Sequence, residues 1–297
     1  MGKKIWYSKP LSEMWAQYNK FNHQTKGTVK EFYYEKNRQI FSNPYISPGD
    51  IQSHASILDL WRLDAHKKFM HLYFKTKELR NFLADMRLAD LDGIIEFLFE
   101  SGETFLFSPS MDGVTSFGTV KKEKIQCYSF GIHVPYEKES KGYAFQLLYN
   151  ERKELTLIWA VGQNEGWCSA DNYKYNLQNK GEHSEFLAKI FRLAINTIAY
   201  MKVFPECVKE GVPKTEQSEC AYTLEVSEKV IELVATSESN RMLSPHFRKG
   251  YIKRLTSDFY THKKGQLIFV SETMVNGVAK TVEKSKDEKK LNDFSEN

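Results

Sequence analysis

The sequence contains few cysteines and none of the short motifs that hold metal ions or phosphate groups. Its four cysteines lie far apart and form no Cys-x-x-Cys pair, so neither a zinc knuckle nor a redox motif is encoded. We expect free, mostly buried thiols. The phosphate loops Gly-x-x-x-x-Gly-Lys-Ser/Thr and Gly-x-Gly-x-x-Gly are absent, and so is His-Glu-x-x-His. We therefore expect no nucleotide, metal ion or other cofactor.

Long hydrophobic runs are missing as well. The longest, residues 93–99 and 155–161, fall far short of the ~20 apolar residues that a membrane helix needs. The chain turns polar within its first few residues, so we expect no secretory signal peptide and a cytoplasmic location. An aromatic content of 14% supplies too much apolar area for a wholly disordered chain. A length of 297 residues fits one large domain or two modest ones.

The N-terminal part of the chain has the apolar spacing of helices. Over residues 11–21, apolar side chains recur at steps of three and four, which places them on one helix face. A Ser-Pro-Gly-Asp turn at residues 47–50 interrupts this pattern, and a longer helical block with a break near Lys75 then extends over residues 57–86. We predict that residues 1–90 form a helical N-terminal region.

The middle of the chain changes to the pattern of strands. Four β-branched and aromatic runs of strand length occupy residues 103–107, 127–134, 143–149 and 155–161. Short turns join them, which favours an antiparallel meander. Residues 185–203 carry a broad apolar stripe for a long helix that packs on this sheet. We therefore predict an α+β fold, with a mostly antiparallel central sheet, covered on one side by helices, in a core of residues 91–240.

The C-terminal part is predicted to end in a basic β-hairpin. Residues 222–234 fit a strand or a short helix, and we favour a strand at their start. Residues 266–270 and 274–279 are joined by a turn with an Asn-Gly pair, which accepts the positive φ of a tight turn. We assign residues 241–282 to this hairpin and residues 283–297, which are charged and poor in apolar side chains, to a disordered tail.

One short pattern is typical of a nuclease. Glu151-Arg152-Lys153 follows a predicted strand, and restriction-type nucleases use Glu-x-Lys near a strand end, where carboxylates hold Mg²⁺. Asp112 is the one upstream acid that stands out as a partner. A solvated turn between two strands explains the same residues, and we favour it. A Ser-His-Asp arrangement cannot be recognised from sequence order, so we assign no catalytic residue and lean against an enzyme.

Two further groups of polar residues invite a metal-binding interpretation. Asp90 and Asp92 lie close together, but a calcium loop needs a longer run of oxygen ligands, so we prefer a helix-ending turn. His66 and His71 are five residues apart in a predicted helical block, which points them to different faces. We expect both histidines to be exposed and assign no metal ligands.

The net charge of +4 is unevenly distributed. Residues 241–264 contain seven Lys and Arg against one acid, a net charge of +6, so the rest of the chain carries −2. Aromatic side chains are interleaved with these cations, a combination that binds phosphates and stacks on bases or engages an acidic protein surface. A merely solvated face is the alternative. The candidate binding residues are His246, Arg248, Lys249, Tyr251, Lys253, Arg254, Lys263 and Lys264.

The same segment resembles a C-terminal signature of phage and plasmid proteins. Residues 244–255 read Ser-Pro-His-Phe-Arg-Lys-Gly-Tyr-Ile-Lys-Arg-Leu, followed by a Gly-led strand and a Val-Asn-Gly turn. The signature runs Pro-His-x-Arg-x-Gly-His-x-Arg before a similar strand and turn, and His246, Arg248, Gly250 and Arg254 carry the match. Tyr251 departs from it, because the family usually has His there. Loss of that His removes a candidate base or ligand and disfavours catalysis at the hairpin.

The family includes the type V-A anti-CRISPR protein that blocks biogenesis of its target nuclease, and the wider order of elements is similar. The resemblance implies a mobile-element anti-defence protein that works without catalysis. It would bind a host defence (CRISPR) protein or its nascent chain, with RNA contact through the basic hairpin. From the residues alone, a nucleic-acid-binding accessory protein is the alternative, and a metal-dependent nuclease is a less favoured one.

Overall fold

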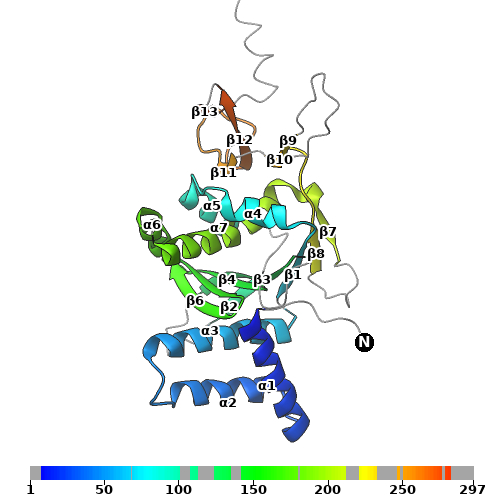
Figure 1. Cartoon of the computed structure of the whole chain (residues 1–297), viewed down its shortest axis with the longest axis vertical. Coiled ribbons are helices and arrows are strands. Elements are labelled where there is room, and N and C mark those ends of the chain that lie inside the picture. Colours follow the sequence, from blue (N-terminus) through cyan, green and yellow to red (C-terminus); the bar gives the residue numbers. More distant parts are fainter. Residues whose placement is uncertain are drawn as a thin grey trace, which may run out of the picture.

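The central sheet lies between two layers of helices (Figure 1). The computed structural model describes residues 8–67, 69–100, 108–112, 124–134, 142–179, 181–211, 221–232, 246–247, 250–275 and 278–281. The sheet has eight strands in the order β6-β5-β4-β3-β1-β8-β7, with β2 also paired to β3. The strands are β1 (Met70–Phe74), β2 (Ser108–Asp112), β3 (Lys124–His133), β4 (Tyr143–Tyr149), β5 (Leu155–Val161), β6 (Asn164–Ser169), β7 (Val208–Glu210) and β8 (Ala221–Leu224).

The predicted α+β class is confirmed, but the sheet is mixed rather than mostly antiparallel. The cause is β1, which runs parallel to both of its neighbours, β3 and β8, while the other pairs are antiparallel. Its residues were assigned to a helical block, because Leu72 fits a helical stripe. The run Met-His-Leu-Tyr-Phe is in fact a central strand, and four of its five side chains are buried. Strands covered on both faces show little polar alternation.

His71 was expected to be an exposed helix residue, and this prediction is wrong. It lies on β1 and is only 5% exposed, with its Nε2 atom 3.4 Å from Oδ1 of the buried Asp64. The indole N–H of Trp15 also donates to that carboxylate, at 2.5 Å. A buried charge needs such partners, so the three side chains join α1, α3 and β1 through polar contacts. His66 is exposed, as expected.

One helical layer is formed by α1 (Lys9–Thr25), α2 (Val29–Phe41) and α3 (Pro48–Ala65), below the sheet in Figure 1. Local chemistry sets the helix starts. The hydroxyl of Thr28 accepts a hydrogen bond from the backbone N–H of Glu31, whose carboxylate accepts one from the backbone N–H of Thr28. The Ser47 hydroxyl accepts from the N–H of Asp50, so the predicted Ser-Pro-Gly-Asp turn begins α3.

The other layer lies on the opposite face of the sheet, so the prediction that helices cover one side is wrong. It contains α4 (Lys77–Asp85), α5 (Leu91–Glu100), α6 (Ala170–Gln178) and α7 (Glu182–Val203). The predicted long helix is thereby confirmed and begins three residues earlier. Two apolar clusters fill the two interfaces, which explains why the sheet needs helices on both faces. None of the described helices is long and apolar enough to cross a membrane.

The C-terminal strands form a separate small sheet beside α5 and α7. It consists of β11 (Gly250–Arg254), β12 (Leu267–Val275) and β13 (Val278–Thr281), all antiparallel, while β9 (Ile231–Glu232) pairs with β10 (His246–Phe247). The predicted hairpin is thus present in β12 and β13. Its Asn-Gly turn, the predicted strand 103–107 and the predicted tail 283–297 lie outside the described residues. Cys127, Cys168 and Cys207 are free and buried, as expected.

His133 on β3 provides a test of how burial affects stability at acidic pH. Burial lowers its pKa from the ordinary value of 6.5 to about 4. Its contribution to stability is therefore present above pH 6.5 and is lost as the pH falls toward 4, because the unfolded chain binds the proton first. After a discount for its partial exposure, we expect wild type to lose about 1 kcal/mol more than His133→Gln between pH 7.5 and pH 5. Urea titrations at both pH values measure the difference, and equal losses would contradict it.

Candidate functional site

The basic hairpin is held on the body of the protein by acidic side chains of α5. Asp90 precedes the helix, and its carboxylate accepts hydrogen bonds from the backbone N–H of Gly93 at 3.2 Å and from that of Arg254 at 3.0 Å. It therefore caps α5 and fixes β11 at the same time. The guanidinium of Arg254 pairs with the carboxylate of Glu96, one turn further along α5. Asp90 thus stands at the start of α5. The prediction of a helix-ending turn at this position is wrong.

Tyr251 and Gly250 serve the packing of the hairpin. The Tyr251 side chain is buried, and the guanidinium of Arg87 lies 4.3 Å from the centre of its ring. Tyr251, which stands where the signature usually has His, therefore contributes to packing. A Cβ atom on Gly250 would lie 2.4 Å from the Val270 carbonyl and 2.6 Å from the Phe269 ring. The close approach of β11 and β12 therefore requires glycine at this position.

The predicted binding residues are divided among several places. Lys253 lies on β11, half-buried, and Arg254 follows it. Counted from Pro245, the last arginine of the signature falls on Lys253, so the match assigned to Arg254 is displaced by one residue. Lys263 and Lys264 are exposed in the loop of residues 255–266, where Lys264 pairs with Asp258. His246 belongs to β10, whose side chains are not described, and Arg248 and Lys249 lie outside the described residues. The structure therefore describes the side chains of Tyr251, Lys253, Arg254, Lys263 and Lys264 among the predicted residues, and Arg254 donates to the carbonyl oxygen of Gly265, next to Lys264, at 3.3 Å.

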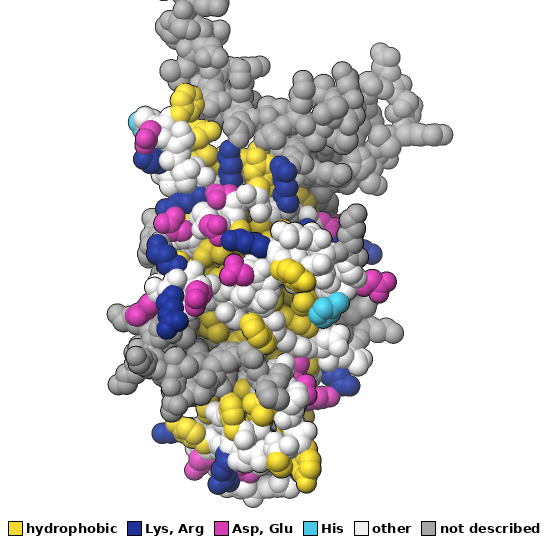
Figure 2. Space-filling model, turned by 90° about the vertical axis from the view of Figure 1, so that its left-hand side faces the viewer, with side chains coloured by type: hydrophobic (Ala, Val, Ile, Leu, Met, Phe, Trp, Pro, Cys, Tyr) yellow, Lys and Arg dark blue, Asp and Glu magenta, His cyan; other side chains and the backbone are white. Residues whose placement is uncertain are grey.

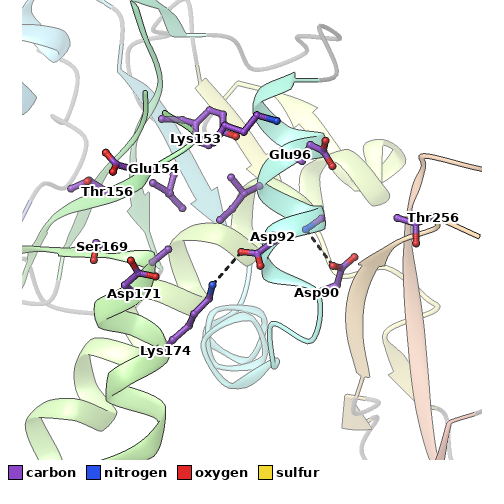
Figure 3. Close-up of a pocket in the computed structure, with 15 residues that line it drawn as sticks. Asp90, Asp92, Glu96, Lys153, Glu154, Thr156, Ser169, Asp171, Lys174 and Thr256 are labelled. Atoms are coloured by element: carbon purple, nitrogen blue, oxygen red, sulfur yellow. Dashed lines mark hydrogen bonds and ion pairs between the residues drawn. The ribbon is translucent and has the colours of Figure 1, made fainter. Parts of the chain in front are cut away.

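A hollow beside the hairpin is lined mainly by acidic side chains, and we call it the acidic pocket. Its volume is about 750 Å³, and it lies between α5, the start of α6, the β4–β5 turn and Thr256 of the hairpin (Figure 3). Five carboxylates and two ammonium groups line it: Asp90, Asp92, Glu96, Glu154, Asp171, Lys153 and Lys174. Acids are therefore in excess by three.

The ion pairs in the acidic pocket leave part of this charge uncompensated. Lys174 of α6 reaches across to Asp92 of α5, with Nζ 3.4 Å from Oδ1 (Figure 3). Glu96 is compensated by Arg254 of the hairpin. Glu154 accepts a hydrogen bond from the neutral amide of Asn150 at 2.8 Å, and Asp171 has no ion-pair partner among the described residues. Opposite charges brought into this hollow are attracted by the remaining carboxylates.

The Glu-x-Lys pattern forms the turn between β4 and β5. The side-chain oxygen of Asn150 accepts from the backbone N–H groups of Arg152 at 3.0 Å and Glu154 at 2.9 Å, and Lys153 takes a positive φ of 64°. These are features of an Asx turn, which agrees with the favoured interpretation. The described residues contain no group of three His, Cys, Asp or Glu side chains that could hold a metal ion. Side-chain positions of Asp112, the expected partner acid, are not described.

No family model, curated protein or solved structure matches the chain. Functional inference therefore depends on the geometry of the site and on the residues of the hairpin.

The face that carries α6 shows charged side chains of both signs gathered across its middle, with apolar side chains between them (Figure 2).

Several pocket residues were not selected from the sequence, namely Glu96, Glu154, Asp171 and Lys174. One signal was present: Asp92 and Glu96 are four residues apart in α5, which places them on the same helix face. The other contacts depend on tertiary structure. Asp90 meets Arg254 across 164 residues of sequence, and Glu96 meets it across 158.

Proposed function

We propose that the protein is a cytoplasmic anti-defence protein of a phage or plasmid, which acts without catalysis by binding a host CRISPR protein or its nascent chain. The acidic pocket is the site that receives a Lys- or Arg-containing segment of that partner. The resemblance of the hairpin to the anti-CRISPR family supports the biological role. The excess of carboxylates at the base of the hairpin supports the mode of binding, and it is the observation that carries the proposal.

The dimensions and charge of the acidic pocket suit a peptide. A volume of about 750 Å³ lies within the range of pockets that take small ligands, roughly 300–1,000 Å³, and accommodates a few residues of an extended segment. The walls come from α5 and α6 and from the β4–β5 turn, so they are formed by regular elements rather than by long loops. Such a site is pre-organised, which reduces the entropic cost of binding.

Arg254 illustrates the recognition that we propose. Its guanidinium is already paired with Glu96 at the edge of the acidic pocket, so the α5 surface accepts a cationic side chain from a neighbouring strand. A partner segment would use the carboxylates that remain, Glu154 and Asp171, in the same way. Phosphate groups would be repelled at this site.

Charge reversal at the two uncompensated carboxylates tests the proposal. Cells carrying a type V-A CRISPR nuclease and a matching guide are transformed with the targeted plasmid, in the presence or absence of the protein. We expect the wild-type protein to raise transformation and to recover the nuclease in affinity purification, including after ribonuclease treatment. Glu154→Lys with Asp171→Lys should reduce the protection at least tenfold, because both replacements repel a cationic segment.

A second double variant controls for the change in net charge. Glu210→Lys with Glu228→Lys alters two exposed acids outside the acidic pocket by the same amount and should retain full protection. Thermal melting of both variants excludes unfolding as the cause. If the wild-type protein neither protects the plasmid nor recovers the nuclease, the proposed function is wrong. Equal protection by the two double variants would reject the acidic pocket as the site.

One observation favours a second candidate, a nucleic-acid-binding accessory function of the hairpin. Phe259 is 75% exposed at the tip of the loop 255–266, next to Tyr260 and near the exposed Lys263. An exposed ring with adjacent cations can stack on bases of single-stranded RNA. In that case ribonuclease would abolish recovery of the nuclease in the purification described above, whereas peptide capture predicts no change.

A further inference from the structure

A second pocket lies at the β6 edge of the sheet, and we call it the aromatic pocket. Its volume is about 680 Å³, and it is lined by residues of α3, β5, β6 and the start of α7. Three aromatic rings contribute to its wall: Trp159, Trp167 and Phe186. Phe186 stands edge-on to Trp159 with ring centres 5.6 Å apart, and Trp167 is 42% exposed. A large, partly exposed aromatic surface is thus available to a ligand.

The indole N–H of Trp159 has no hydrogen-bond partner among the residues that the structure describes. Trp159 is only 5% exposed, and its Nε1 atom is buried without an acceptor. The ring lies over its cross-strand neighbour Gly166, where a Cβ atom would come within 2.8 Å of it. Both residues line the aromatic pocket, so the unsatisfied donor belongs to a lining side chain. Other buried polar atoms in the described part of the protein, the Trp61 indole nitrogen among them, also lack a partner, but Trp159 is a lining residue of a pocket, where a ligand can supply the acceptor.

Acidic side chains surround the same site. Glu165 lines the aromatic pocket and accepts a hydrogen bond from the ring of His54, with Nδ1 3.0 Å from Oε1. Burial raises the pKa of Glu165, and the nearby carboxylates of Glu13 on α1 and Asp50 on α3 raise it further. The hydrogen bond and charge of His54 lower the pKa of Glu165. Glu182 of α7 is a further lining acid. His183 also lines the aromatic pocket, but its described lining contains two carboxylates and no Lys or Arg, which disfavours anions and favours a cation.

We propose that the aromatic pocket binds the side chain of an arginine in a peptide segment. The planar guanidinium stacks on Trp167 and Phe186 and donates to the Glu165 carboxylate, a combination that a guanidinium satisfies better than an ammonium group. Rotation of the half-buried Phe186 uncovers the Trp159 indole, which then donates to the carbonyl oxygen of the adjoining peptide bond. This inference is independent of the acidic pocket and of the biological role proposed above.

The test uses the full chain and a defined probe, acetyl-Gly-Arg-Gly-amide. Its citrulline analogue has nearly the same shape without the charge. Nuclear magnetic resonance of the tryptophan indole N–H groups follows binding, because the Trp159 proton should move downfield when it gains an acceptor. We expect saturable shifts of the Trp159 and Trp167 signals with a dissociation constant on the order of 1 mM. The citrulline peptide should bind at least tenfold more weakly.

Variants separate this site from other surfaces. Trp167→Ala and Glu165→Gln should each weaken the arginine peptide at least fivefold, with Trp167→Ala followed on the Trp159 signal. Tyr175→Ala, which removes a ring that is 66% exposed on α6, should bind like wild type. Glu154→Lys with Asp171→Lys should also leave these shifts unchanged, because neither residue lines the aromatic pocket. The binding test therefore remains valid if the function proposed for the acidic pocket is wrong. Equal binding of the citrulline peptide, or an unchanged affinity of Trp167→Ala for the arginine peptide, would overturn the inference.

Discussion

Replacement of Trp61 by alanine is expected to lower the free energy of unfolding by about 3–5 kcal/mol, the range for truncating a large core aromatic residue. Trp61 lies on α3 and is fully buried between the N-terminal helices and the sheet. Its ring contacts those of three neighbours, at centre distances of 4.8 Å to Phe32, 5.1 Å to Tyr18 and 5.8 Å to Trp15. Removal of this ring would therefore abolish contacts that join α3 to both α1 and α2.

Equilibrium unfolding in urea, followed by far-ultraviolet circular dichroism, measures the effect without depending on tryptophan fluorescence. Trp167→Ala is the matched control, because the same replacement at a 42% exposed position should cost less than about 1 kcal/mol. Trp61→Phe should cost far less than Trp61→Ala, since the Nε1 atom of Trp61 has no hydrogen-bond partner to lose. A cost below about 1 kcal/mol for Trp61→Ala would show that this cluster does not hold the layer together.

The elements that were predicted best are those whose sequence pattern matches their burial. The predicted strands 143–149 and 155–161 coincide with β4 and β5, and the stripe of α7 agrees with a helix buried along most of its length. The elements that were not predicted include β6, α6, α5 and β7. β6 carries a glycine beneath Trp159 and few β-branched residues, so its strand character comes from pairing with β5 and not from local preference.

The candidate site was less accessible to sequence reasoning than the fold. The run of cations at the hairpin is visible in the sequence. The ion pair of Arg254 with Glu96 and the hydrogen bond from the β11 backbone to Asp90 are not. Sequence order does not reveal which helix a distant strand will contact, so the sequence does not link Asp90 or Glu96 to the hairpin. The acidic pocket proposed as the binding site depends on these tertiary contacts.

Asn196 joins α4 and α7, which pack against each other in the helical layer that also contains α5. It lies in the middle of α7, fully buried, and its amide donates to the carbonyl oxygens of Leu83 at 2.9 Å and Met86 at 2.8 Å. These carbonyls are at the C-terminal end of α4, where no further turn of helix supplies donors. One buried side chain thus satisfies two groups that would otherwise lack partners.

Asn196→Ala is therefore expected to lower the free energy of unfolding by about 2–4 kcal/mol, because two buried carbonyls lose their donors. Asn196→Asp should cost more at pH 7, since a buried carboxylate would face the same two oxygens. Burial raises the pKa of such a carboxyl group, and its protonated form restores one hydrogen-bond donor. The difference in free energy of unfolding between wild type and Asn196→Asp should therefore become smaller as the pH falls to 4.5. Urea titrations of the three proteins at both pH values measure these differences. A pH-independent deficit for Asn196→Asp, or a loss below about 1 kcal/mol for Asn196→Ala, would show that the α4 carbonyls find other donors, and that Asn196 does not hold α4 on α7.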